Sequence, residues 1–174
     1  THNWSKWAFS TITDNRDGMT TTYRTVDIRD TTVMVDNLKF RHTDDYGANW
    51  ICDDDIESNC DRYGTRYSWD AAVALQGVNE SSDKKIQGAC PNGWHVPNSV
   101  EGKWLQGKLE GKYGFPQYLE GEGYDPEPTP RIWWTSKRNS NASSNTAFAY
   151  EFGKTELSGR TRNNAYYIRC IKDY

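Results

Sequence analysis

The sequence predicts an α+β domain built on an antiparallel sheet. Short runs in which apolar residues alternate with polar ones open and close the chain, and two helix-forming segments lie between them. A segment rich in proline and glycine, Phe115 to Arg131, separates the helices from the final strands and can form neither a helix nor a central strand. This order of strands, helices, long loop and strands is typical of α+β folds rather than of alternating βαβ units.

Length and composition favour one domain. A chain of 174 residues and 20.0 kDa fits a single core, and we expect a lead-in over residues 1–12 and one domain over residues 13–174. Mean hydropathy is low at −0.95, but 8 Trp, 11 Tyr and 5 Phe supply apolar surface for a core. The net charge of −3, without a basic stripe, argues against a nucleic-acid partner. We expect no membrane insertion and a soluble or already processed chain, because no apolar run is long enough and the start lacks a signal-peptide core.

The first elements follow from periodicity and turn residues. Alternating apolar residues over positions 20–35 predict two short strands around a turn at Arg29 and Asp30. The acidic stretch 49–62 predicts a loop. Residues 67–75 contain helix formers and predict a first helix that ends before Gly77.

The second helix carries a clearer signature. Asn98 and Glu101 have the spacing of a capping box, and apolar residues follow at helical intervals up to Leu109. Gly102 and Gly107 each weaken a helix by up to about 1 kcal/mol relative to Ala, so we expect tertiary packing to hold it. Beyond the long loop, residues 132–135, 146–152 and 165–171 predict strands, and the polar stretches 136–145 and 159–164 between them predict loops.

Four cysteines, an even number without a Cys-x-x-Cys pair, favour disulfides over a zinc site. Three connectivities can be drawn, and we favour Cys52 with Cys60 and Cys90 with Cys170. The first pair brackets a polar loop, and the second would tie the middle of the chain to its last strand. Two disulfides in a polar, Tyr- and Trp-rich chain indicate a secreted or extracellular protein.

Several strings resemble one known family. They are Asp14-Asn15-Arg16-Asp17-Gly18, Tyr63-Gly64-Thr65-Arg66-Tyr67-Ser68-Trp69 and Cys90-Pro91-Asn92-Gly93-Trp94-His95-Val96-Pro97. Over about residues 13–173 the chain resembles the Fibrobacter succinogenes major paralogous domain, which occurs in secreted and surface proteins of bacteria. The resemblance implies a C-type-lectin-like fold, similar to that of sulfatase-modifying enzymes, with two helices flanking a twisted antiparallel sheet and a long loop on the ligand face. It implies binding or adhesion at a bacterial cell surface, without a shared ligand.

The expected function is therefore that of a non-catalytic binding domain. A polysaccharide or glycan is the expected ligand, and a surface protein bound by the same face is the alternative partner. Aromatic rings with polar tips suit sugar rings, and the candidate ligand residues are aromatic or polar: Trp133, Trp134, Tyr118, Tyr124, Tyr166, Asn139, Asn141, Arg160 and Arg162. Because adjacent strand residues point to opposite faces, one of Trp133 and Trp134 should face outward. We assign Trp69, Trp94 and Trp104 to the core.

The sequence contains one candidate metal site. Oxygen-bearing side chains alternate as in the first positions of a calcium loop, at Asp53, Asp55, Glu57 and Asn59. Ser58 stands where an EF-hand requires Gly, so the alternative is a solvated acidic loop closed by the Cys52–Cys60 bridge. No other cofactor is expected.

Catalysis has weaker support in the sequence. His95 has no obvious nucleophile partner and is interpreted as a structural residue at the turn into the second helix. A carbohydrate-active hydrolase would need a carboxylate pair from the long loop, where Glu120, Glu122, Asp125 and Glu127 lie. A proline-rich loop would hold such a pair loosely, and we predict that the protein is not an enzyme.

Overall fold

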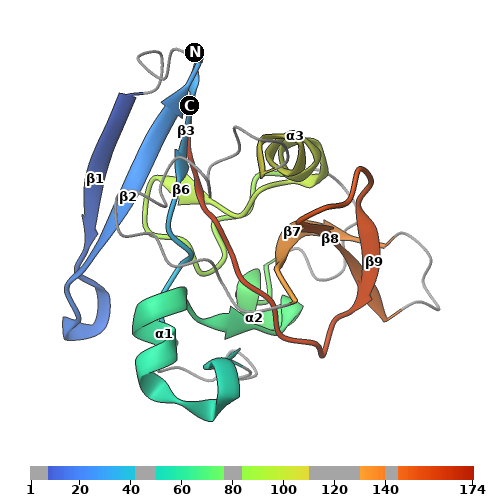
Figure 1. Ribbon diagram of the computed structural model, residues 1–174, viewed down its shortest axis with the longest axis horizontal. Coiled ribbons are helices and arrows are strands. Elements are labelled where there is room, and N and C mark those ends of the chain that lie inside the picture. Colours follow the sequence, from blue (N-terminus) through green and yellow to red (C-terminus); the bar gives the residue numbers. More distant parts are fainter. Residues whose placement is uncertain (1–7, 42–49, 77–83, 110–129, 140–144) are drawn as a thin grey trace.

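The computed structural model describes residues 8–41, 50–76, 84–109, 130–139 and 145–174. It is an α+β structure in which every strand pairing is antiparallel within the sheets, as the sequence predicts. Figure 1 shows one sheet at the left of the molecule, a second sheet at the right beneath helix α3, and helices α1 and α2 below. No helix in the described ranges is long and apolar enough to cross a membrane.

The larger sheet has the strand order β1-β2-β3-β10-β6. Its strands are β1 (Ala8–Asp14), β2 (Thr21–Ile28), β3 (Thr31–Met34), β10 (Ile171–Lys172) and β6 (Trp94–His95). The two strands expected within residues 20–35 are confirmed, and Arg29 makes the turn between them with a left-handed φ of 57°. Strand β1 was not expected. It places residues 8–12 of the expected lead-in inside the sheet, because they pair with β2 along their whole length.

The second sheet has the order β7-β8-β9, with β7 (Ile132–Arg138), β8 (Thr146–Glu151) and β9 (Ser158–Thr161). Strands β7 and β9 extend into segments expected to be polar loops. A small third sheet pairs β4 (Trp50–Ile51) with β5 (Arg66–Tyr67). The last stretch, 165–171, is mostly irregular rather than a strand, but its isolated bridges from Tyr166 to Tyr67 and from Tyr167 to Trp133 connect the smaller sheets.

Within the described ranges the α-helices are α1 (Glu57–Tyr63), α2 (Trp69–Ala72) and α3 (Ser99–Leu109), and η2 (Arg16–Gly18) and η3 (Asp53–Asp55) are single 3-10 turns. Helix α1 occupies the segment expected to be a loop. Helix α2 is shorter than predicted because Ala74 and Leu75 adopt left-handed φ values of 49° and 58°. Helix α3 has the predicted bounds within one residue.

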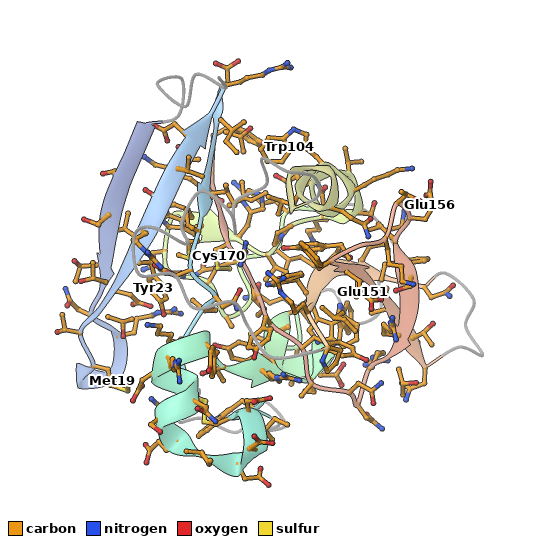
Figure 2. The ribbon with its side chains drawn as sticks, viewed as in Figure 1. Met19, Tyr23, Trp104, Glu151, Glu156 and Cys170 are labelled. Carbon is orange, nitrogen blue, oxygen red and sulfur yellow. A yellow bond between two sulfur atoms is a disulfide. The ribbon has the colours of Figure 1, made fainter. Side chains whose placement is uncertain are left out.

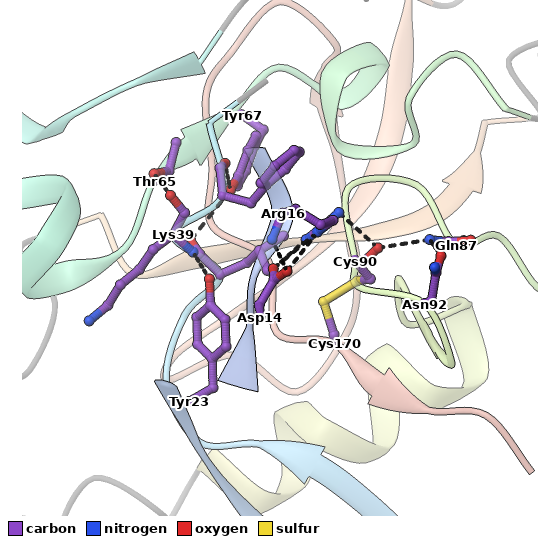
Figure 3. A network of polar contacts seen from close by, with 12 residues as sticks. Asp14, Arg16, Tyr23, Lys39, Thr65, Tyr67, Gln87, Cys90, Asn92 and Cys170 are labelled. Atoms are coloured by element: carbon purple, nitrogen blue, oxygen red, sulfur yellow. Dashed lines mark hydrogen bonds and ion pairs between the residues drawn. A yellow bond between two sulfur atoms is a disulfide. The ribbon is translucent and has the colours of Figure 1, made fainter. Parts of the chain in front are cut away.

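Both predicted disulfides are present, Cys52–Cys60 and Cys90–Cys170. Figure 3 shows the polar network around the second bridge. The Cys90 carbonyl accepts hydrogen bonds from Arg16 Nη1 at 3.2 Å and from Gln87 Nε2 at 3.1 Å, and Arg16 also forms a 2.7 Å ion pair with Asp14 at the end of β1. The bridge and this network join the segment before β6 to the β1–β2 hairpin and to the chain entering β10.

Candidate ligand-binding groove

The expected tryptophan platform is buried. Trp133 and Trp134 are both 0% exposed, so the expectation that one of them faces outward is wrong. Strand β7 is covered on both faces: Trp133 stacks on Tyr150 with ring centroids 5.5 Å apart, and Trp134 packs against Tyr166 at 4.9 Å. Their indole N–H groups donate internally, to Asn37 Oδ1 and to the carbonyl of Tyr67, each at 2.7 Å. Neither ring therefore offers a face to a sugar.

The other predicted ligand residues that the structure describes do not form a common site. Tyr166 is buried against Trp134. The Arg160 guanidinium pairs with Glu151 at 2.6 Å, whereas that of Arg162 pairs with Asp70 at 2.5 Å and lies over the ring of Trp69. Asn139 is partly exposed at the end of β7, where its N–H donates to the carbonyl of Thr146. Tyr118, Tyr124 and Asn141 lie outside the described residues.

The proposed calcium ligands are divided between a 3-10 turn and a helix. Asp53 forms a 2.7 Å ion pair with Arg66, and Glu57 forms one of 2.8 Å with Arg41. The Asn59 amide donates to the carbonyl of Asp53 at 2.9 Å. Among the described residues, no group of three or more His, Cys, Asp or Glu side chains could hold a metal ion. The four side chains thus do not converge on one point in this structure, because arginines satisfy two of the carboxylates and the chain continues as helix α1.

A different part of the surface has the features of a binding site. A groove of about 530 Å³ runs between helix α3 and the β7-β8-β9 sheet. Its apolar lining consists of Val100, Trp104, Phe148 and Leu157, and its polar lining of Ser99, Lys103, Lys137 and Glu156. Figure 2 labels two of these residues, Trp104 on α3 and Glu156 in the turn between β8 and β9.

The local structure fixes both walls of the groove. Phe148 lies on the face of β8 that α3 covers, because Tyr150, two residues along the same face, is fully buried beneath the helix. Gln106 of α3 is 1% exposed, and its Nε2 donates to the carbonyls of Glu151 at 3.1 Å and Glu156 at 3.3 Å. The helix thereby holds the turn between β8 and β9 that carries Glu156 and Leu157.

Sequence reasoning missed this groove by placing Trp104 in the core. The ring is partly exposed and packs on the edge of the core, whereas its neighbour Leu105 is 1% exposed. Val100 and Trp104 lie four residues apart and form a separate apolar stripe on α3, beside the face that buries Leu105. Val100 is 69% exposed. The spacing from Val100 to Trp104, next to Lys103, is the signal that could have indicated a surface stripe.

The side chain of His95 connects the first turn of α3 with the segment that follows β10. Its ring is 3% exposed, with Nδ1 at 2.7 Å from Asp173 Oδ1 and Nε2 at 2.9 Å from Glu101 Oε2. Glu101 also completes the predicted capping box, since its side chain accepts from the Asn98 N–H at 3.0 Å and its own N–H donates to Asn98 Oδ1 at 2.9 Å. With a carboxylate on each nitrogen, the imidazole has no free position for a substrate and serves to anchor the start of α3.

Burial by itself lowers the pKa of His95, but the hydrogen bonds and charges of Glu101 and Asp173 outweigh it, so the pKa is raised above its usual 6.5. For Glu101, burial acts to raise the pKa, and the hydrogen bonds from His95 and the Asn98 N–H lower it overall. Both shifts favour an ion pair between His95 and Glu101.

Comparison of this chain with protein-family models, with curated proteins and with solved structures gives no match.

Proposed function

We propose that this chain is a non-catalytic glycan-binding domain of a secreted or surface-displayed protein, and that its ligand lies in the groove between α3 and β8. The observation that carries the proposal is the pairing of two partly exposed aromatic rings, Trp104 and Phe148, in one groove with a charged rim. Flat aromatic faces stack on the apolar faces of pyranose rings, and surrounding polar groups bind the hydroxyls.

The remaining features support an extracellular binding role. Two disulfides in 174 residues are compatible with an oxidising compartment. The lectin-like assignment of the fold and the kinship with the Fibrobacter succinogenes major paralogous domain belong to this proposal, and the antiparallel α+β architecture is consistent with both. The aromatic residues proposed to bind the ligand are, however, Trp104 and Phe148 instead of Trp133 and Trp134.

The test is retention on insoluble and soluble glycans by the variants Trp104→Leu and Phe148→Leu. Leucine keeps the apolar contacts that support the fold but removes the flat ring, so we expect loss of retention with little change in stability. Phe152→Leu is the matched control, because Phe152 is 41% exposed, directly follows the same strand and does not line the groove. Retention unchanged in both groove variants, or no retention of the parent protein on any glycan, would contradict the proposal.

The same assay includes calcium and EDTA arms. Loss of retention in EDTA would assign the binding to a metal site and revive the hypothesis built on Asp53, Asp55, Glu57 and Asn59. We expect no effect of EDTA, because the groove is lined by lysine, glutamate, serine and apolar side chains rather than by a cluster of carboxylates.

One observation favours a protein partner as the second candidate. Val100 is 69% exposed beside the apolar lining of the groove, and an exposed aliphatic side chain can be buried by a protein partner but offers no flat face for a sugar ring. A protein partner would lose affinity on the neutral change Val100→Ser, which a glycan stacked on the rings of Trp104 and Phe148 would tolerate.

A further inference from the structure

We propose that strand β1 is a docking edge for a second copy of this chain, and that two β1 strands pair antiparallel to join two five-stranded sheets into one. The inference does not depend on the proposed glycan binding. Strand β1 stands at one end of the order β1-β2-β3-β10-β6, and Figure 1 shows it as the outermost strand at the left of the molecule. Ser10, Thr11 and Thr13 are exposed along it.

The hydrogen bonds of Arg24 show which backbone groups of β1 point outward. Arg24 lies opposite Thr11 in the β1–β2 ladder. Its carbonyl accepts from the Val35 N–H at 2.8 Å, and its N–H donates to Asp36 Oδ2 at 2.8 Å, so both groups point away from β1. Because antiparallel strands alternate between hydrogen-bonded and non-hydrogen-bonded pairs, Thr11 and Arg24 form a non-hydrogen-bonded pair. The N–H and C=O of Thr11, and by alternation those of Thr13, therefore point to the outer edge of the sheet.

This edge lacks the features that protect most edge strands. Charged side chains, proline, bulges and short length all discourage pairing through the edge of a sheet. Residues 8–13 contain no charge and no proline, and β1 pairs with β2 over seven residues in an unbroken register. At the other end of the strand order, β6 is two residues long and both are buried. Pairing through β1 alone gives a closed dimer rather than a fibre.

The strand is complementary to itself, which identifies the second copy as its occupant. An antiparallel pair centred on Thr11 places this residue opposite its own equivalent, and threonine pairs across strands are favourable. Backbone hydrogen bonds then connect residues 9, 11 and 13 of one copy with residues 13, 11 and 9 of the other. Asp14, the one charged residue of β1, lies opposite Ala8 in this register. A parallel pair in register would instead bring the two Asp14 carboxylates together.

The experiment follows the mass of the chain by sedimentation velocity over roughly a hundredfold range of protein concentration. We expect a shift from monomer to dimer as the concentration rises, because one strand pair is a smaller contact than a permanent interface. Thr11→Pro removes an outward N–H but no hydrogen bond to β2, and proline is accepted on edge strands. This variant should self-associate about tenfold more weakly or not at all. Thr11→Val is the matched control, because it keeps the N–H and a β-branched side chain, and it should dimerise as the parent protein does.

Hydrogen exchange of single amides tests the geometry in the parent protein and does not depend on whether Thr11→Pro folds. The N–H groups of Thr11 and Thr13 should exchange fast in dilute protein and about tenfold more slowly in concentrated protein. Those of Ser10 and Ile12, which point to β2, should be protected at every concentration. A chain that is monomeric at every concentration would overturn the inference, and so would a folded Thr11→Pro variant that dimerises like the parent. Slow exchange of Thr11 in the monomer would also overturn it, because the edge would then be paired within the chain.

Discussion

Gly102 of helix α3 lies directly against Thr135 of strand β7. A Cβ built on Gly102 would stand 2.5 Å from Thr135 Cγ2, and 3.4 Å from the ring of Tyr150. Thr135 is fully buried, and its hydroxyl donates to the carbonyl of Phe148 at 2.7 Å, so moving its side chain away would break this hydrogen bond. The absence of a side chain at position 102 thus allows α3 to lie close to the sheet.

Gly102→Ala should therefore destabilise the fold, although alanine favours helices. The overpacking costs about 1–3 kcal/mol, which exceeds the gain in helix propensity of up to about 1 kcal/mol. Gly107→Ala is the matched control, because no described atom lies within 4 Å of its Cβ, and it should stabilise the helix. Urea unfolding of both variants measures the difference. A stabilising effect of Gly102→Ala would contradict the close packing of α3 on β7.

The pair Gly102 and Thr135 also shows what could be predicted from the sequence. The capping box at Asn98 and Glu101 is a local pattern, and it predicted the start of α3 correctly. The glycines predicted that packing must hold the helix, which the contact with Thr135 confirms. The partner of Gly102 could not be predicted, because it lies 33 positions along the chain and no local pattern connects the two.

Elsewhere, tertiary structure overrode local patterns. Alternation predicted one outward tryptophan in β7, but a second layer covers each face of the strand, so both rings are buried. Helix α1 has no apolar stripe, since Cys60 is its one buried residue, and the Cys52–Cys60 bridge supports it instead. Strand β1 pairs with β2 in a hairpin, and the weak alternation of Ser10 to Thr13 gave no signal of its own.

The two disulfides should differ in their contribution to stability. The Cys90–Cys170 bridge spans 80 residues and the Cys52–Cys60 bridge spans 8. On the loop-entropy model the long bridge contributes about 4–5 kcal/mol and the short one about 2.5 kcal/mol. Replacing each pair with alanine and measuring the free energy of unfolding tests the order. Equal losses, or a larger loss for the short bridge, would show that loop entropy does not dominate here.

Asp36 should make stability depend on acid pH. Burial acts to raise its pKa, but the hydrogen bonds from the Arg24 guanidinium and N–H and the Arg24 charge lower it overall. A carboxyl group whose folded pKa is lowered contributes stability above its unfolded pKa, and that contribution is lost as pH falls through the folded pKa. Asp36→Asn should cost about 1 kcal/mol at neutral pH, because the pair is only partly buried. The difference in the free energy of unfolding between Asp36→Asn and the parent protein, measured by urea unfolding, should shrink in acid. A difference independent of pH would show that the charge of Asp36 does not contribute to stability.

His95 should make stability depend on pH in the opposite direction. Its pKa is raised in the folded state by Glu101 and Asp173, so the folded protein binds the proton more tightly than the unfolded chain does. The resulting stabilisation is complete below the unfolded-state pKa of about 6.5 and is lost as pH rises through the higher folded pKa. His95→Gln can still donate a hydrogen bond but carries no charge, so it should be less stable than the parent in mild acid and closer to it in mild alkali. Urea unfolding across this range, with the histidine titration followed by NMR, measures both quantities. If the parent and His95→Gln lose stability in parallel as pH rises, the link between β6, the C-terminal Asp173 and the start of α3 does not depend on a charged imidazole.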